Sequence, residues 1–233
     1  MLELIQELIT SPLQQSIIYF SQLPFFELLA VCTALIYVVL AAKGNIWCWP
    51  AALVSTLLYT SIFYDVYLWM DSALQVYYMG MALYGWYCWR NNANDTGLKQ
   101  PVSDQIKQAS SPLQIKKWRA STHFIAITIL SLLSLLLGWF MANYTPTHFP
   151  YFDAATTVFA VFATYLVTQK VLENWIYWIV IDFASIYLYL EKELTPTATL
   201  FVLYVGLALY GYIQWLKLYK QQNTATQYVL SKS

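Results

Sequence analysis

The sequence is poor in charge: only 10% of its 233 residues are Asp, Glu, Lys or Arg, against about 25% in ordinary water-soluble domains. Acidic and basic residues balance at 12 each, so no excess of positive charge is available for binding nucleic acid. Hydrophobic residues make up 59% of the chain and aromatic residues 18%. This composition excludes a water-soluble domain and predicts an all-α integral membrane protein.

The sequence also lacks the motifs of common enzyme classes. Neither a GxxxxGK[ST] phosphate-binding loop nor an HExxH metalloprotease motif occurs. The histidines, His123 and His148, stand near opposite ends of one apolar run, which favours interface positions over metal ligation. Cys32, Cys48 and Cys88 each stand alone in apolar surroundings, which is typical of small buried side chains. We therefore expect no enzyme activity, no cofactor and no metal.

The N-terminus lacks the basic region, short apolar core and small-residue cleavage site of a secretory signal. Residues 1–22 are instead predicted to form an amphipathic helix at the membrane interface. Pro12 is expected to break or kink this helix because proline cannot donate a backbone hydrogen bond.

Apolar runs of about 20 residues are long enough to cross a bilayer as helices. Seven such runs occur, at about 25–42, 46–68, 72–89, 120–142, 151–169, 174–190 and 196–216. They predict seven transmembrane helices in a 3+1+3 arrangement, in which the odd central helix lets the second unit run parallel to the first. The predicted parts are a first three-helix repeat (25–89), a cytoplasmic loop (90–119), a linking helix (120–142), a second three-helix repeat (151–216) and a cytoplasmic tail (217–233).

Two apolar segments repeat each other without a gap at an offset of 126 residues: GMALYGWYCW at 80–89 and GLALYGYIQW at 206–215. The segment upstream of each copy opens on asparagine and carries tryptophan four residues later, namely Asn45 with Trp49 and Asn174 with Trp178. A duplicated membrane unit is typical of a transporter, because two related halves enclose one site near the midplane and can rock around it.

The basic residues fall almost entirely on one side of this predicted topology. Eleven of the twelve lie in the loops and tail of one side, and only Lys192 lies on the other. The positive-inside rule then predicts an outer N-terminus and a cytoplasmic C-terminus. Five carboxylates gather at the outer loops: Asp65, Asp71, Asp153, Glu191 and Glu193. They would either attract a cationic solute or simply be solvated helix ends.

One carboxylate, Asp182, falls near the middle of run 174–190, where a charge costs roughly 2.5–3.5 kcal/mol even on insertion scales. It must therefore face the protein interior. Helical spacing places Trp175, Trp178 and Ser185 on the same face. Tryptophan one turn from a carboxylate suits a planar cation, which stacks on the indole while the carboxylate balances its charge. The alternative is a structural Asp that accepts hydrogen bonds from neighbouring Tyr or Trp side chains.

Polar residues of the first repeat are weaker candidates. Gln75 lies one turn from Tyr78, and its amide could bind a sugar hydroxyl or a carboxamide, or could instead join two helices. Ser55, Thr56 and Tyr59 occupy adjoining positions, although Ser and Thr often bond only their own helix. The predicted substrate-binding residues are Trp178, Asp182, Ser185, Gln75, Trp175, Tyr59, Tyr78 and Asn174.

Several aromatic segments resemble the bacterial nicotinamide riboside transporter (PnuC) family of vitamin transporters, over most of the chain from Glu27 to Trp215. The segments are NIWCWP (45–50), Asp71 with LQVYY (74–78), ALYGWYCW (82–89), ENWIYWIVID (173–182) and TATLFVLYVGLALYGYIQW (197–215). The resemblance implies a fold akin to SWEET sugar transporters and a homotrimer in the bacterial inner membrane. It also implies facilitated diffusion of a vitamin or nucleoside-like precursor, trapped inside by a cytoplasmic kinase.

The resemblance leaves the substrate open. Nicotinamide riboside transporters of the family are similar to this chain in using a tryptophan of the sixth span, here Trp178, to hold the pyridinium ring. Amides near that ring bind the ribose, whereas this chain has Asp182 at the corresponding position. A carboxylate would suit thiamine, a permanent cation with an aminopyrimidine and no ribose. Both substrates remain candidates, alongside a proton-coupled transporter that uses Asp182 and a membrane scaffold with no substrate.

Overall fold

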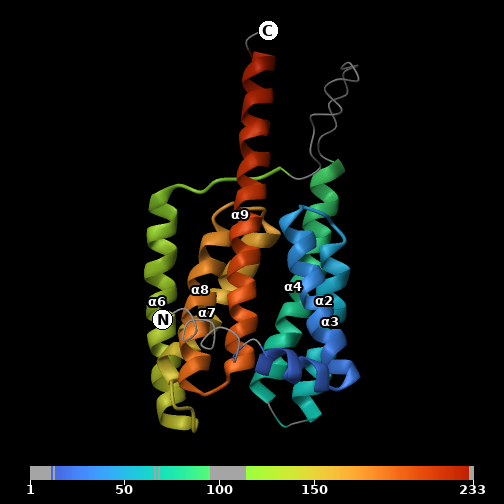
Figure 1. The fold of residues 1–233 in the computed structure, drawn as a ribbon. Helices are drawn as coiled ribbons and strands as arrows, with labels where there is room; N and C mark the ends of the chain where they lie inside the picture. Colours follow the sequence, from blue (N-terminus) through green and yellow to red (C-terminus); the bar gives the residue numbers. More distant parts are fainter. Residues whose placement is uncertain (1–11, 13, 66, 68, 95–113, 231–233) are drawn as a thin grey trace, which may run out of the picture.

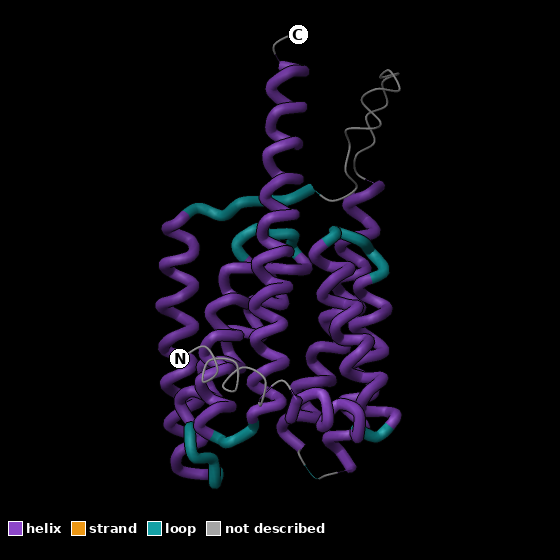
Figure 2. The backbone as a smooth tube through the Cα atoms, viewed as in Figure 1, coloured by secondary structure: helices purple, strands orange, loops and turns teal. Residues whose placement is uncertain are grey.

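The computed structural model describes residues 12, 14–65, 67, 69–94 and 114–230, and these residues are almost entirely helical (Figures 1 and 2). The helices are α2 (Phe25–Ala42), α3 (Cys48–Asp65), α4 (Trp69–Asn94), α6 (Ala120–Tyr144), α7 (Pro150–Thr168), α8 (Asn174–Glu191) and α9 (Thr195–Leu230). The prediction of an all-helical membrane protein is confirmed. The predicted interfacial helix 1–22, loop 90–119 and tail 217–233 lie partly outside the described residues.

The helices begin and end within a few residues of the predicted runs, with one clear exception. Helix α9 continues past the apolar stretch to Leu230, although hydrophobicity alone placed its end at 216. Residues 217–230 contain Lys, Gln and Ala but neither Gly nor Pro, so nothing interrupts the backbone hydrogen bonding. Apolar run length therefore marks where a helix can meet lipid and does not mark where it stops.

By length and hydropathy, four helices of the described chain could cross a membrane: α2, α6, α7 and α9, the last of these over Thr195–Thr224. The mean hydropathy of helices α3, α4 and α8 is too low for them to be counted among these four. They carry many Trp and Tyr residues together with Ser, Thr, Gln and Asp. These three helices also contribute most of the polar side chains that line the central cavity described below. Low hydropathy in these helices reflects the polar side chains that they contribute to the cavity.

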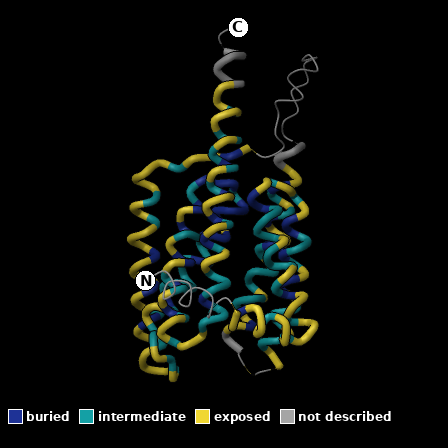
Figure 3. Tube along the Cα trace, in the orientation of Figure 1, coloured by how far each residue is buried: buried dark blue, intermediate teal, exposed yellow. Residues whose placement is uncertain are grey.

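The helices pack as two three-helix groups, which we call the first repeat (α2, α3, α4) and the second repeat (α7, α8, α9). Within each group the middle helix packs against both others, and the groups meet through α2 with α9 and α4 with α7. Each contact therefore joins the first helix of one repeat to the third helix of the other. Helix α6 packs mainly on α7 at the side of the bundle and buries only Leu130, Ser134 and Gly138 (Figures 1 and 3).

The turns of the two repeats correspond at the same 126-residue offset. After α2 and α7, the backbone takes a left-handed conformation at Gly44 (φ 68°) and Lys170 (φ 58°). After α3 and α8, it does so again at Tyr67 (φ 62°) and Glu193 (φ 58°). Glycine adopts this conformation without strain, whereas a side chain there costs roughly 1 kcal/mol or more. Both repeats thus keep the same helix-ending geometry although only one of the four positions is glycine.

Four buried tryptophans join the repeats at the end of the bundle where α2 and α7 finish. Trp89 donates its indole N–H to the Val167 carbonyl at 3.3 Å, and Trp215 donates to the Ala41 carbonyl at 3.0 Å. The donors are 126 residues apart, and so are the acceptors. One tryptophan of each third helix, Trp89 or Trp215, is thereby hydrogen-bonded to the first helix of the opposite repeat.

The same cluster corrects the predicted pairing of Trp49 with Trp178. Trp49 packs edge-on against Trp89 (5.2 Å, 86°), and Trp175 packs edge-on against Trp215 (5.5 Å, 90°). Trp49 therefore corresponds to Trp175 at the 126-residue offset. Matching the Asn-to-Trp spacing shifted the alignment by three residues, because nearly one helical turn preserves the face and so also preserves the apolar pattern.

Candidate functional site

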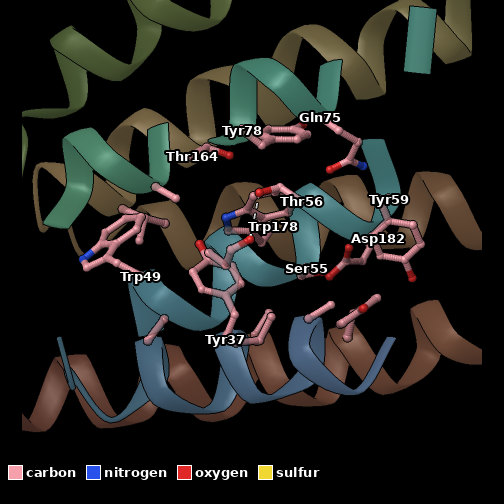
Figure 4. A pocket seen from close by; sticks show the side chains of 18 of the residues that line it. Tyr37, Trp49, Ser55, Thr56, Tyr59, Gln75, Tyr78, Thr164, Trp178 and Asp182 are labelled. Carbon is pink, nitrogen blue, oxygen red and sulfur yellow. Dashed lines mark hydrogen bonds between the residues drawn. The ribbon is translucent and has the colours of Figure 1, made fainter. Parts of the chain in front are cut away.

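A cavity of about 270 Å³ lies between the two repeats, next to the tryptophan cluster. Its lining includes six of the eight predicted substrate-binding residues: Trp178, Asp182, Gln75, Trp175, Tyr59 and Tyr78. Figure 4 places Trp49 toward one end of this cavity, Trp178 and Thr56 near its middle, and Gln75, Tyr59 and Asp182 toward the other end. The structure thus gathers residues from α3, α4 and α8 around one space.

Two predicted residues do not line the cavity. Ser185 is buried on α8, one turn beyond Asp182. Asn174 is completely buried at the start of α8 and donates its side-chain amide to the Val171 carbonyl at 2.6 Å. Its amide caps the α7–α8 turn, which explains why an asparagine stands there.

Asp182 lies on the cavity wall with 4% of its surface exposed. Among the described residues, none donates a hydrogen bond to its carboxylate and none forms an ion pair with it. The alternative of a structural Asp held by neighbouring Tyr or Trp donors therefore finds no such bond here. Burying an unpaired carboxylate costs free energy, and a cationic or hydrogen-bond-donating group that enters the cavity would reduce this cost by pairing with Asp182.

The charge of the cavity has one sign. Asp182 is the one acidic side chain among the described lining residues, and no Lys, Arg or His belongs to that lining. The other lining groups are aromatic, apolar, hydroxyl and amide side chains. Such a wall stabilises a cationic aromatic molecule and disfavours an anion.

Three hydroxyl groups of the lining donate hydrogen bonds to backbone carbonyls of helices. Ser55 bonds the Ala30 carbonyl at 3.1 Å, Thr56 bonds the Ala52 carbonyl at 2.9 Å, and Thr164 bonds the Ala160 carbonyl at 2.8 Å. Each oxygen keeps lone pairs that can accept a further hydrogen bond. These hydroxyl groups can therefore serve the cavity as acceptors.

The cavity straddles the boundary between the repeats, and much of its lining comes in pairs 126 residues apart. Some pairs keep similar side chains: Trp49 with Trp175, Tyr78 with Tyr204, and Ala82 with Ala208. Other pairs differ in size or charge: Ala52 with Trp178, Thr56 with Asp182, and Gln75 with Phe201. The repeats thus supply a symmetric frame that holds a chemically asymmetric lining.

Sequence reasoning missed several lining residues. Tyr204 is the repeat partner of Tyr78, so the 126-residue offset could have found it. Tyr37 and Thr164 lie on α2 and α7, whose apolar sequences offer no comparable signal. Only the packing of α2 and α7 across the repeat boundary turns these two side chains toward the cavity.

A buried lysine lies beside the tryptophan cluster. The Lys170 ammonium is 5.8 Å from the ring centroid of Trp89 and has no hydrogen-bond partner among the described residues. Burial, and to a smaller extent the nearby charge of Lys116, lower the pKa of Lys170 to about 8. The segment carrying Lys116 is bonded to this turn, with the Lys116 N–H donating to the Lys170 carbonyl at 2.9 Å.

At the opposite end of the bundle, Lys192 is not an isolated basic residue. Its ammonium lies 2.9 Å from a carboxylate oxygen of Asp153, whose other oxygen accepts a 2.6 Å hydrogen bond from Thr147. One of the five carboxylates predicted at the outer loops, which we call the acidic rim, is therefore neutralised by an ion pair. The rim attracts cations less strongly than its five carboxylates suggest.

Known transporters are similar to this chain over nearly its whole length. Residues 24–217 match the family model described as nicotinamide mononucleotide transporter. The chain is 23% identical over 220 residues to the nicotinamide riboside transporter PnuC of Escherichia coli, covering 87% of this chain and 89% of that protein. It is 26% identical over 181 residues to the riboflavin/roseoflavin transporter RibM of Streptomyces davaonensis, covering 78% of this chain and 79% of that protein.

A solved structure shares the fold. The crystal structure of the vitamin B3 transporter PnuC superposes with a TM-score of 0.68 at 21% identity, covering 91% of this chain and 90% of that one. Sequence identity at this level supports a common backbone arrangement. It leaves the identity of the side chains in the cavity to be argued from this chain alone.

Proposed function

The chain belongs to the nicotinamide mononucleotide transporter family, and from this premise we propose that it takes up a small cationic vitamin through the cavity between its repeats. It is a membrane vitamin transporter of the PnuC family. In the proposed site, Trp178 stacks on the aromatic ring of the substrate and Asp182 balances its positive charge. Gln75 and the tyrosines Tyr59 and Tyr78 orient its polar groups.

The observation that carries this proposal is the unpaired carboxylate of Asp182 in a cavity whose described lining holds no Lys, Arg or His. A phosphate group would meet a like charge here and would find no counter-ion. The proposed substrate is therefore an uncharged or cationic nucleoside-like molecule rather than a mononucleotide. Nicotinamide riboside fits this description, because its pyridinium can stack on Trp178 beside the carboxylate.

A second candidate substrate is thiamine. Its thiazolium ring is also a permanent cation, and its aminopyrimidine can donate hydrogen bonds to Asp182. The curated relatives include both a nicotinamide riboside transporter and a riboflavin/roseoflavin transporter, so members of similar sequence carry different aromatic substrates. The neutral ring system of riboflavin would leave the charge of Asp182 unbalanced, which ranks it below the two cations.

The proposed mechanism is facilitated diffusion by alternating access. Seven spans cross the membrane in a 3+1+3 arrangement, with the N-terminus outside and the C-terminus in the cytoplasm. The repeats rock about their α2–α9 and α4–α7 contacts, and the helix ends open the cavity to each side in turn. A cytoplasmic kinase then traps the product, so no energy-coupling motif is needed. A homotrimer in the bacterial inner membrane completes the proposal.

The test is isothermal titration of purified protein with nicotinamide riboside, thiamine and riboflavin, repeated on Trp178→Ala and Asp182→Asn. Saturable binding of one of the cations that both substitutions weaken, with both variants folded, supports the site and its substrate together. Failure of the folded wild-type protein to bind either cation would refute the proposal.

Proton coupling through Asp182 is the competing mechanism. Uptake into vesicles that contain no kinase distinguishes the two, because facilitated diffusion equilibrates the substrate without a driving force. An uncoupler that abolishes accumulation above the external concentration would favour proton coupling. Equilibration that an uncoupler leaves unchanged supports the facilitator. A scaffold without substrate would show neither uptake nor binding.

A further inference from the structure

The hydroxyl groups that line the cavity offer a second selection rule, beyond charge and ring stacking. Thr56 occupies the position on α3 that corresponds to Asp182 on α8, and both residues line the cavity. Figure 4 shows the Thr56 side chain near the middle of the cavity, with its hydroxyl hydrogen-bonded to the Ala52 carbonyl. The two repeats therefore contribute one polar side chain each from equivalent positions.

The proton of the Thr56 hydroxyl is already used. It is directed at the Ala52 carbonyl (2.9 Å) and the Leu53 carbonyl (3.1 Å), one turn back on the same helix. The neighbouring Ser55 hydroxyl donates across to the Ala30 carbonyl on α2 at 3.1 Å. Toward a ligand, both hydroxyl oxygens can therefore accept a hydrogen bond but cannot donate one.

Asp182 is also an acceptor when ionised, as is the Thr164 oxygen after its bond to the Ala160 carbonyl. Acceptors therefore stand on α3, α7 and α8 around the same cavity. A carbonyl or ether oxygen of a ligand would face lone pairs at these positions, whereas an N–H group would find a partner. Unmatched buried polar groups are costly, so this difference translates into selectivity.

From this arrangement we infer that Thr56, supported by Ser55, is a specificity-determining residue that selects a cationic aromatic substrate carrying an N–H donor, such as an exocyclic amino group, on the side facing α3. The inference rests on the proposed function, since it assigns a further contact to the same site. It goes beyond that proposal because it assigns a hydrogen-bond acceptor on α3, at a residue that the proposed site leaves out.

The experiment compares two ligands that differ at one edge of the pyrimidine ring, where the 4-oxo analogue replaces the amino group by a carbonyl and carries a proton on the adjacent ring nitrogen. Thiamine has a 4-amino group on its pyrimidine, and its 4-oxo analogue has a carbonyl there, while both keep the thiazolium cation. Isothermal titration of the full-length protein in detergent gives both affinities, with nicotinamide riboside as a third ligand. We expect thiamine to bind at least about tenfold more tightly than the 4-oxo analogue.

The variant Thr56→Val keeps the shape of the side chain and removes the acceptor. We expect it to reduce the preference for the amino compound to about threefold or less. Thr60→Val is the matched control, because the Thr60 hydroxyl makes the same kind of bond, to the Thr56 carbonyl at 2.6 Å, but does not line the cavity. It should keep the full preference. Ser55→Ala, with an intermediate loss, checks the supporting role.

Each other outcome is decisive. Equal affinity of the wild-type protein for the two thiamine analogues overturns the inference and leaves the proposed function standing. If only nicotinamide riboside binds, equal affinity of the wild-type protein and folded Thr56→Val for it, through its carboxamide N–H group, overturns the inference in the same way. An unchanged preference in folded Thr56→Val overturns the role of Thr56. If the folded wild-type protein binds none of the three cations, the proposed function fails and the inference falls with it.

Discussion

The first and second repeats share their packing and differ in the side chains they present to the cavity. The tryptophan pairs, the cross-repeat hydrogen bonds and the left-handed turns all recur at an offset of 126 residues. Around the cavity, Ala52 faces the same space as Trp178, and Thr56 the same space as Asp182. The comparison teaches that the packing positions are duplicated, whereas several cavity positions differ in size or charge between the repeats.

A physical reason connects these two behaviours. Two halves that rock about one site need similar contacts on both sides of their interface, since this keeps the two access states close in free energy. A vitamin has no two-fold symmetry, so a symmetric lining would match only one part of it. In the proposed site, the differences at Ala52/Trp178 and Thr56/Asp182 place the stacking tryptophan and the carboxylate on the second repeat.

The largest expected effect comes from removing the charge that distinguishes the repeats. Asp182→Asn keeps the size of the side chain and should weaken binding of a cationic substrate at least about 30-fold, because a charged hydrogen-bond partner is lost inside the cavity. Isothermal titration measures the loss. Asp153→Asn, on the outer rim, is the control and should change affinity less than about threefold. Equal losses in both variants would mean that Asp182 acts only through long-range charge.

The next effect tests whether the ring platform can be moved to the other repeat. Trp178→Ala should weaken binding about 10- to 30-fold, through loss of stacking and of apolar contact. Ala52→Trp alone should obstruct the cavity, because it adds a second indole to a space of about 270 Å³. The double variant should recover part of the affinity lost in either single variant. A double variant no better than the worse single variant would contradict the equivalence of positions 52 and 178.

The third prediction concerns two glycines that occupy equivalent positions in the packed part of the repeats. A Cβ atom at Gly211 would lie 2.7 Å from carbons of the Trp175 indole, and one at Gly85 would overlap the Trp49 indole. Gly85→Ala and Gly211→Ala should each destabilise the protein by about 1–3 kcal/mol through overpacking. Thermal unfolding followed by intrinsic fluorescence measures the effect.

Two further glycines in the same segments are matched controls. A Cβ at Gly80 or Gly206 meets no other atom within 4 Å. Gly80→Ala and Gly206→Ala should therefore leave stability unchanged or raise it slightly, since alanine favours the helix. A large loss in one repeat and none in the other would show that the tryptophan packing is not equivalent.

The smallest effect concerns the turn that carries glycine in the first repeat and lysine in the second. Because burial lowers the pKa of Lys170 from 10.5 to about 8, the unfolded chain holds a proton between these values that the folded chain has lost. Stability should therefore rise as the pH increases from 8 to 10.5, and the cost of the buried charge should be constant below pH 8.

Lys170→Met keeps most of the apolar stem and removes the charge. It should raise the apparent melting temperature at pH 7 by roughly 2–4 °C, corresponding to about 1 kcal/mol, and should remove the contribution of Lys170 to the rise between pH 8 and 10.5. Lys43→Met, at an exposed position beside Gly44, is the control and should change neither quantity. A lower melting temperature for Lys170→Met would mean that the contact with Trp89 outweighs the cost of burial.

The hydrophobic runs predicted the helices well because bilayer thickness fixes the length of a spanning helix. The internal repeat predicted the division into related halves, and the cost of a charge in lipid singled out Asp182. The same local information matched Trp49 with Trp178 as equivalent positions, because a shift of nearly one helical turn leaves the apolar pattern intact. Contacts between Trp49 and Trp89, and between Trp175 and Trp215, were needed to set the correct alignment.

The sequence by itself thus determined the membrane class, the helical content, the repeat and the residue whose charge requires an interior position. The repeat follows from comparing the chain with itself, and the other three follow from local composition measured against one solvent, the lipid bilayer. Tertiary structure alone decided that Tyr37 and Thr164 reach the cavity, that Asn174 and Ser185 do not, and that the Ser55 hydroxyl donates to the Ala30 carbonyl on α2. These facts depend on how the helices pack against one another, and no single helix carries that information.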